Sequence, residues 1–256
     1  MRGSRGGWVP NYHGAWAMII APPLLGISLG GFTWRHLLLL VAWWVGFFAF
    51  FAAAKWLRAR NRSRFTPALV TYGTVTALAT LVLLSLTWPL TVWACAYLPL
   101  IAATAYLTVT GRERSLLNDI VTIVAAGLTG PVAAHLSDLA GHDVEWAHVW
   151  LASALLTAYF VGTAFYVKTN IRRRGDRGFF ATSVGYHAAL ALATTWYVLA
   201  AGDPLIHPLH AAVWWVLTAR TYLVATVAQG RGRRVSPKII GIGEILATLA
   251  VALTLL

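Results

Sequence analysis

Hydrophobic stretches of about 20 residues recur along the whole chain and are separated by short polar segments. A helix that crosses the hydrocarbon core of a membrane needs about 20 apolar residues at a rise of about 1.5 Å each. The pattern therefore predicts an all-α, polytopic membrane bundle of about nine transmembrane helices, forming a single integral membrane domain over residues 1–256. The expected helices lie near residues 13–32, 36–55, 67–86, 89–109, 115–136, 146–167, 178–199, 205–228 and 239–256.

Composition supports this interpretation. Of the 256 residues, 59% are hydrophobic and 11% are charged, which is too few charges to cover a water-soluble protein of this length. The apolar run after the basic N-terminus is interrupted by Pro22 and Pro23 and lacks a small-residue cleavage site, so we expect a retained first helix and not a removed signal peptide. The single cysteine, Cys95, lies in an apolar segment and excludes an intramolecular disulfide.

Lysine and arginine fall in every second polar segment. Cytoplasmic loops of membrane proteins carry an excess of these residues, because moving positive charge across the membrane during insertion is disfavoured. Of the 20 Lys and Arg residues, 18 collect on one side, whereas Arg35 alone lies on the other side. That other side carries Asp138, Asp143, Glu145 and Asp203. The distribution predicts an N-terminus inside and a C-terminus outside.

The formal net charge of +12 does not indicate a nucleic acid partner. Basic loops are the ordinary outcome of membrane insertion, and attraction to anionic headgroups adds about 1 kcal/mol per residue near the surface. We therefore expect membrane lipids as partners, with no nucleic acid.

Few ionisable residues lie inside the predicted helices, where each costs at least a few kcal/mol unless it is paired or hydrated. The alternation of helix direction puts all of them in the inner part of the membrane. Their common depth predicts a polar cavity that faces the cytoplasm. Arg220 and Glu244 are placed to pair, and Asp119 is placed to meet His187 or Arg220. The candidate cavity residues are His13, Asp119, His187, Arg220 and Glu244.

Each candidate also has a structural interpretation. Arg220 and Glu244 are equally compatible with a static ion pair that locks helix packing. His13 is placed where it can cap a helix or lie at the interface, and His187 beside Tyr186 is compatible with a simple interhelical hydrogen bond.

A polar cluster on the outer side lacks the spacing of a metal site, and no phosphate loop, nucleophile elbow or paired-cysteine motif occurs. We therefore expect no metal and no cofactor. The residues of this cluster are His135, Asp138, His142, Asp143, Glu145 and His148, with His207 and His210 elsewhere.

Three separated motifs resemble those of the YwiC-like family, and the resemblance covers nearly the whole chain. It implies a bacterial multi-pass protein of the cytoplasmic membrane without an assigned activity. The motifs are Val9 to Met18 followed by Pro22 to Gly26, Asn118-Asp119 followed by Ala-Gly-Leu-Thr-Gly-Pro, and Val167 to Arg172 with Tyr186-His187 beyond. Through these motifs the resemblance adds Asn118, Lys168 and Asn170 to the candidate cavity residues.

The architecture is also similar to that of the UbiA-type intramembrane prenyltransferases, which have nine helices with the N-terminus inside. That group binds magnesium and a prenyl diphosphate through aspartate-rich motifs in two inner loops. The corresponding segments here, 55–64 and 168–177, hold ten basic residues and a single acid, Asp176. Magnesium needs several carboxylate oxygens, so this mechanism is not expected here.

Two hypotheses follow from the sequence. The first is a non-enzymatic membrane protein that binds or moves an anionic lipid, an isoprenoid or a small solute through the inner cavity. The second is a prenyl- or lipid-transferase on a UbiA-like scaffold, in which basic loops replace magnesium. The scarcity of acids in the two basic segments favours the first.

Overall fold

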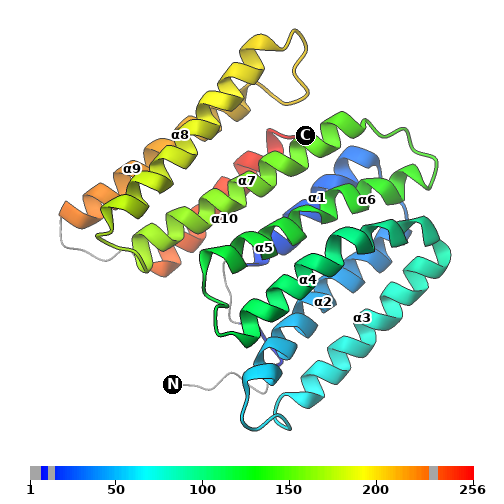
Figure 1. Ribbon diagram of the computed structural model, residues 1–256. Coiled ribbons are helices and arrows are strands. Elements are labelled where there is room, and N and C mark those ends of the chain that lie inside the picture. The colour runs from blue at the N-terminus through cyan, green and yellow to red at the C-terminus, as the bar shows by residue number, and fades with distance from the viewer. Residues whose placement is uncertain (1–6, 11–14, 231–235) are drawn as a thin grey trace. The chain divides into compact units, whose positions relative to one another are not determined.

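The computed structural model describes residues 7–10, 15–230 and 236–256, and these residues form helices joined by short connections, with no strand among them (Figure 1). The short 3₁₀ helix η1 runs directly into α4, and α5 is followed directly by α6, so the described residues form nine helical segments. The all-α class and the number of segments predicted from the sequence are confirmed. The bounds are α1 (Ala15–Gly30), α2 (Arg35–Arg58), α3 (Thr66–Leu86), η1 (Trp88–Trp93), α4 (Ala94–Val109), α5 (Leu116–Gly127), α6 (Thr129–Asp138), α7 (Trp146–Ile171), α8 (Arg177–Ala200), α9 (Leu209–Gly230) and α10 (Pro237–Leu253).

Five segments are long and apolar enough to cross a membrane, namely Arg35–Arg58, Thr66–Leu86, Trp88–Val109, Leu116–Asp138 and Trp146–Ile171. Large apolar side chains are exposed along the helices, as lipid-facing positions require, and examples are Leu81, Leu98 and Leu192. These properties are those of a helical, multi-pass membrane protein.

The segment predicted as one helix over residues 115–136 is broken at Leu128. Pro131 has no backbone N–H, so the carbonyl of Gly127 loses its usual helical donor. The hydroxyl of Thr129 donates to the carbonyl of Ala126 at 2.6 Å and satisfies a second backbone group at the break. Local sequence therefore determines where this helix is interrupted.

The eighth predicted helix, over residues 205–228, begins at Leu209 and not at residue 205. Proline disfavours the helical conformation at the residue before it, so Pro208 keeps His207 outside the helix. A single proline therefore accounts for the later start of α9.

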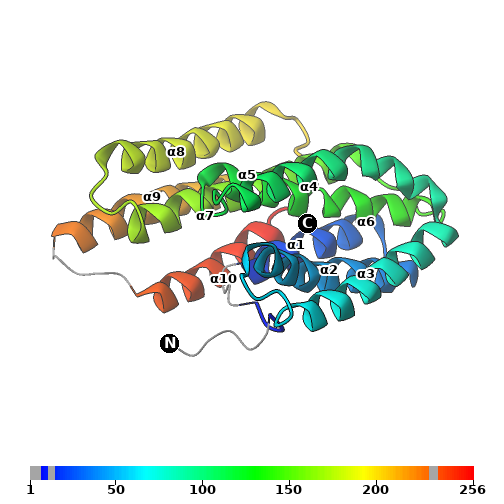
Figure 2. The same ribbon diagram turned by 60° about the horizontal axis from the view of Figure 1, so that its bottom comes forward.

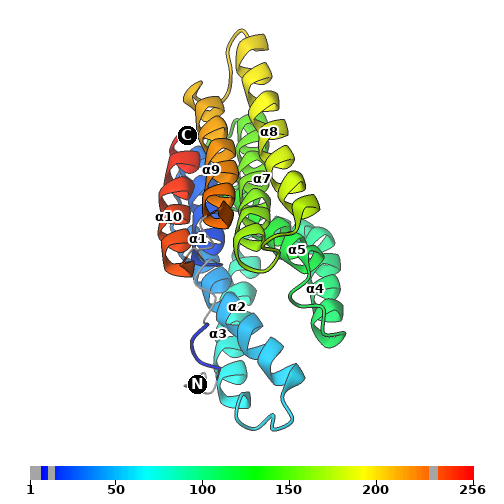
Figure 3. The ribbon, with the colours of Figure 1, turned by 90° about the vertical axis from the view of Figure 1, so that its left-hand side faces the viewer.

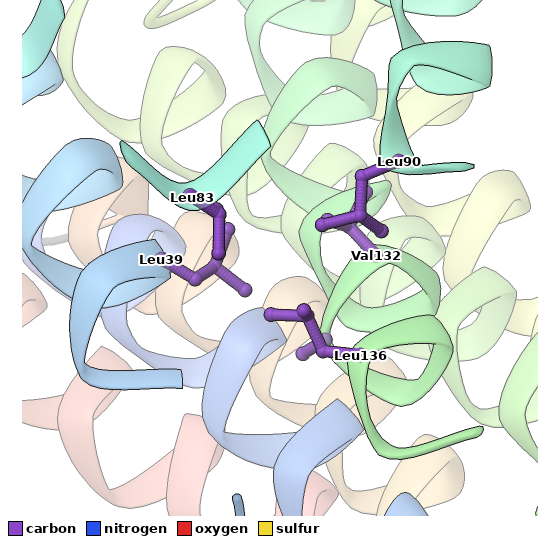
Figure 4. Close-up of a cluster of buried hydrophobic side chains, with 6 residues drawn as sticks. Leu39, Leu83, Leu90, Val132 and Leu136 are labelled. Atoms are coloured by element: carbon purple, nitrogen blue, oxygen red, sulfur yellow. The ribbon is translucent and has the colours of Figure 1, made fainter. Parts of the chain in front are cut away.

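The chain divides into two compact units, Met1–Val149 and Trp150–Leu256. The single domain over residues 1–256 stays a prediction. In the first unit α2 and α3 run side by side (Figures 1 and 3). Buried side chains from α2, α3, η1 and α6 form a hydrophobic cluster (Figure 4), whose residues are Leu39, Leu83, Leu90, Val132, Ala133 and Leu136.

Helices α1 and α6 approach each other closely through glycine. A Cβ atom built on Gly26 would lie 2.0 Å from the carbonyl oxygen of Gly130, so only glycine fits at this position. One turn along, a Cβ on Gly30 would lie 2.7 Å from the Oγ of Ser137. The same Ser137 hydroxyl donates to the carbonyl of Gly31 at 2.6 Å. The two helices are therefore in near backbone contact over at least two turns.

The proline pair of α1 frees a carbonyl that α2 then binds. Pro23 cannot donate to the carbonyl of Ile19, four residues earlier. The indole Nε1 atoms of Trp43 and Trp44 donate to that carbonyl oxygen at 2.9 and 3.2 Å. Because an unsatisfied carbonyl in hydrocarbon costs several kcal/mol (about 2–7), the two indoles both compensate the proline and fasten α1 to α2.

The second unit contains α8 and α9 as side-by-side neighbours in all views (Figures 1, 2 and 3). A hydrogen-bonded chain joins its α9 to Thr254, the residue that follows α10. The Nε1 of Trp214 donates to the Nε2 of His210 at 3.0 Å, and the His210 Nδ1 lies 2.7 Å from the Oγ of Thr254. This chain fixes the pairing of the two helices near the C-terminus.

Candidate functional site

An interhelical pair of opposite charges lies in the second unit. The Nη1 of Arg220, on α9, lies 2.8 Å from the Oε1 of Glu244, on α10. Their side chains are only 19% and 11% exposed. The pairing expected from the sequence is therefore present.

The two carboxylate oxygens of Glu244 have different surroundings. Its Oε2 accepts hydrogen bonds from the hydroxyls of Tyr159 at 3.0 Å and Thr163 at 2.7 Å, both on α7. Its Oε1 contacts Arg220 but accepts no hydrogen bond of good geometry from the described residues. Thr248, one turn along α10, lies 3.1 Å from the Tyr159 hydroxyl and donates to the Glu244 carbonyl. Helix α7 thus holds one oxygen in place, and Arg220 faces the other.

The guanidinium of Arg220 has one occupied edge and one unoccupied edge. Its carbon Cζ lies 4.2 Å from the centre of the Tyr166 ring, which covers one face of the group. Nη1 faces Glu244. Nε and Nη2 form the opposite edge, and both are buried with no hydrogen-bond partner among the described residues. This edge is the one that binds oxyanions through two parallel hydrogen bonds.

His187, on α8, is 1% exposed. Its Nδ1 lies 2.7 Å from the Ser183 carbonyl, so the Nδ1 carries the proton and donates. The other side of the ring packs against α7, where a Cβ on Gly162 would lie 3.0 Å from Nε2. The ring centre is 6.2 Å from that of Trp214 on α9. The ring of His187 therefore packs between α7 and α9, and its hydrogen bond goes to Ser183 and not to Glu244.

Lys168 and Asn170 lie at the C-terminal end of α7 and are both buried. The Nδ2 of Asn170 donates to the carbonyl of Tyr166 at 2.9 Å, within the same helix. Lys168 lies in the last turn of α7, where a cation complements the helix dipole. Both residues are thus placed on the helix that carries Tyr159, Thr163 and Tyr166.

Asn118 and Asp119 lie in the first turn of α5, in the other unit. The Nδ2 of Asn118 donates to the carbonyl of Glu113 at 3.0 Å, and Glu113 forms an ion pair with Arg58. Asp119 occupies a position where a carboxylate complements the helix dipole. The pair therefore organises the start of α5, and its meeting with His187 or Arg220 stays a prediction. His13 lies outside the described residues.

The hydroxyl groups of α7 and α10 around this pair were not among the residues predicted from the sequence. Tyr159, Thr163 and Tyr166 recur at helical spacing, so they share one face of α7, and Thr248 follows Glu244 by one turn. This spacing was available in the sequence. Tyrosine and threonine are common in membrane helices, however, so only the contact with Glu244 and Arg220 distinguishes these positions.

Comparison with known proteins identifies the family. The protein is 32% identical over 183 residues to the "Uncharacterized protein YwiC" of Bacillus subtilis, a match that covers 71% of this chain and 74% of that relative. A sequence model of the family described as "YwiC-like protein" matches residues 9–134. The chain belongs to the YwiC-like family.

A second relative, named "Uncharacterized protein", comes from Haemophilus influenzae. It is 27% identical over 184 residues, which are 72% of this chain and 76% of the relative. No solved structure matches this YwiC-like chain. The similarity to UbiA-type prenyltransferases is not shown by these comparisons and stays a prediction.

Proposed function

We propose that this YwiC-like protein is a non-enzymatic membrane protein that binds or moves an oxyanion, carried by an anionic lipid, an isoprenoid or a small solute. The observation that supports this proposal is the unoccupied edge of Arg220. Two of its guanidinium nitrogens are buried and donate no hydrogen bond to any of the described residues. Buried donors of a charged group cost about 1–3 kcal/mol or more when they are left unpaired, and an oxyanion would supply both missing acceptors.

The surroundings of Arg220 favour binding over a purely structural role. Glu244 needs only Nη1, and Tyr166 covers a face of the group, so the guanidinium is held in a fixed orientation while its two-nitrogen edge stays available. A static pair would be expected to use that bidentate edge for the carboxylate, because it gives two parallel hydrogen bonds.

The depth of the site limits the ligand. Arg220 precedes the end of α9, at Gly230, by ten residues, which corresponds to about 15 Å along the helix. A headgroup that stays at the membrane surface would not reach it. The proposed ligand therefore enters the membrane with its charge, as a transported headgroup or a compact anion does.

A transferase of the UbiA type is less well supported. The single acid of the two basic segments, Asp176, accepts a hydrogen bond from the N–H of Phe179 at 3.0 Å and so caps α8. Its second oxygen lies 3.5 Å from Arg173. An aspartate that is engaged in this way offers magnesium few free oxygens, and the segments hold no further carboxylate.

Binding is tested with sulfonates, which carry a permanent oxyanion. We expect octanesulfonate or methanesulfonate to bind the purified protein in a non-ionic detergent, as followed by calorimetry. Arg220→Lys keeps the charge but loses the two-nitrogen edge, so affinity should fall at least about tenfold. The control is Arg172→Lys, which makes the same change at an exposed arginine and should leave the affinity for sulfonate unchanged.

If octanesulfonate binds more tightly than methanesulfonate, the ligand is a lipid or an isoprenoid. If the two sulfonates bind with equal affinity, the ligand is a small solute. If neither sulfonate binds, or if Arg220→Lys binds as well as the original protein, the proposed function is wrong.

We also infer that the N-terminus lies inside and the C-terminus outside, in a bacterial cytoplasmic membrane. The support is the segregation of 18 of 20 Lys and Arg residues to one side of the expected topology. In a Cys95→Ala background, we expect a membrane-impermeant maleimide to label Asp203→Cys in spheroplasts. Ser63→Cys, in the basic segment after α2, should react only after lysis. The reverse labelling pattern would show that the N-terminus lies outside and the C-terminus inside.

A further inference from the structure

An anion that binds Arg220 would give the site a net negative charge unless a side chain also takes up a proton. Arg220 and Glu244 balance each other, so an oxyanion on the open edge would place two negative charges beside a single positive one. Both side chains are largely buried, and charge imbalance is disfavoured in a medium of low polarity. Binding of an anion there, which rests on the function proposed above, requires a compensating positive charge.

Glu244 has one oxygen that is suited to receive a proton. Oε2 is fixed by the hydroxyls of Tyr159 and Thr163, and a neutral carboxylic acid still accepts both hydrogen bonds at that oxygen. Oε1 accepts no hydrogen bond of good geometry from the described residues, and it faces Nη1 of Arg220 at 2.8 Å. A proton on Oε1 would therefore leave the contacts with α7 intact and release Arg220 from its counter-ion.

The other titratable groups around the pair are less suitable. Tyr159 and Tyr166 face it from α7, and tyrosine hydroxyls are ordinarily neutral at neutral pH, so they offer no anion to accept a proton. His187, on α8, interacts electrostatically with Arg220, and a proton on its ring would add a like charge beside the guanidinium. Glu244 is thus the group whose protonation restores neutrality without creating a repulsive contact.

We propose that the oxyanion and one hydrogen ion bind together. As the anion takes the Nε and Nη2 edge of Arg220, a hydronium ion or buffer acid of the aqueous phase gives up a proton, which forms an O–H bond at Oε1 of Glu244. The bond that held the proton in its donor breaks and leaves water or the conjugate base, and no other covalent bond changes. If the protein moves its ligand, the anion and the proton then travel in the same direction, which makes the site a proton-coupled one.

The experiment measures proton uptake while octanesulfonate binds to the full chain in weakly buffered non-ionic detergent. The sulfonate itself does not titrate between about pH 6 and about pH 8, so any proton comes to the protein. We expect about one proton per bound sulfonate, seen with a pH-indicator dye, and an affinity that falls up to about tenfold for each unit rise in pH.

Glu244→Gln should bind sulfonate without proton uptake and without dependence on pH, because its side chain is already neutral. Glu244→Asp keeps the acid and should retain the uptake, and His187→Asn should retain it as well. Sulfonate binding by the unsubstituted protein with no proton uptake overturns the proton coupling and leaves the proposed function intact. Loss of uptake in His187→Asn alone also overturns it, by assigning the proton to the histidine. Absence of any binding at every pH contradicts the proposed function instead.

Discussion

Replacement of Arg220 by Gln is expected to lower the free energy of unfolding by about 3–5 kcal/mol, and replacement of Glu244 by Gln should have an effect of similar size. Each single change leaves the partner's charge buried without its counter-ion, and both side chains are less than one-fifth exposed. The effect should appear as a large drop in the apparent melting temperature in detergent and as a reduced yield of folded protein.

The double variant Arg220→Gln, Glu244→Gln should recover much of this loss, because it removes both charges together. A matched control is Arg173→Gln. Its partner Asp176 lies 3.5 Å away, and the two side chains are 62% and 39% exposed, so this pair should contribute only about 0–1 kcal/mol. A double variant as unstable as the sum of the single variants would show that the two charges do not stabilise each other.

The double variant also separates packing from ligand binding. It should fold but bind neither methanesulfonate nor octanesulfonate, since no cation remains at the site. If stability and binding both survive, the site lies elsewhere.

Replacement of Gly26 by Ala is expected to destabilise the first unit by about 3 kcal/mol or more. The new Cβ would lie 2.0 Å from the carbonyl oxygen of Gly130 and 2.9 Å from its Cα. The obstacle is backbone, which cannot turn away as a side chain does, so α1 and α6 must separate. That separation would also disturb the contact of Gly30 with Ser137.

The measurement is again the apparent melting temperature in detergent, with Gly73→Ala as the control. Gly73 lies within α3, and no heavy atom lies within 4 Å of the Cβ that it would gain. This control should be neutral or stabilised by up to about 1 kcal/mol, because alanine favours a helix over glycine. Equal melting temperatures for the two variants would contradict the close approach of α1 and α6.

Much of the architecture follows from local sequence. Apolar stretches long enough for a membrane predict nine helical segments, and their ends lie close to those expected from the sequence. Proline explains two of the differences, at Pro131 in the break between α5 and α6 and at Pro208 before α9, whereas α7 runs to Ile171, four residues beyond its predicted end. The two proline differences are effects of single residue types on the backbone, and they were visible in the sequence although the hydrophobic pattern alone did not reveal them.

The candidate site was predictable only in part. Arg220 and Glu244 are conspicuous because ionisable residues are costly inside apolar helices. Their partners are not conspicuous, since Tyr159, Thr163 and Thr248 resemble many other hydroxyl-bearing residues in the chain. The placement of Asn118 in the same cavity stays a prediction, and its side chain donates to the carbonyl of Glu113 in the loop before α5.

The sequence by itself determined the helical class, the number of segments, the asymmetry of charge and the family, because these depend on the length of apolar runs and on motifs along one chain. Only the tertiary structure decided which edge of Arg220 is engaged by Glu244, which oxygen of Glu244 is held by α7, and where α1 and α6 touch at Gly26. Such features depend on the direction of side chains from different helices, and directions across helices are set by packing, which the order of residues along one helix does not specify.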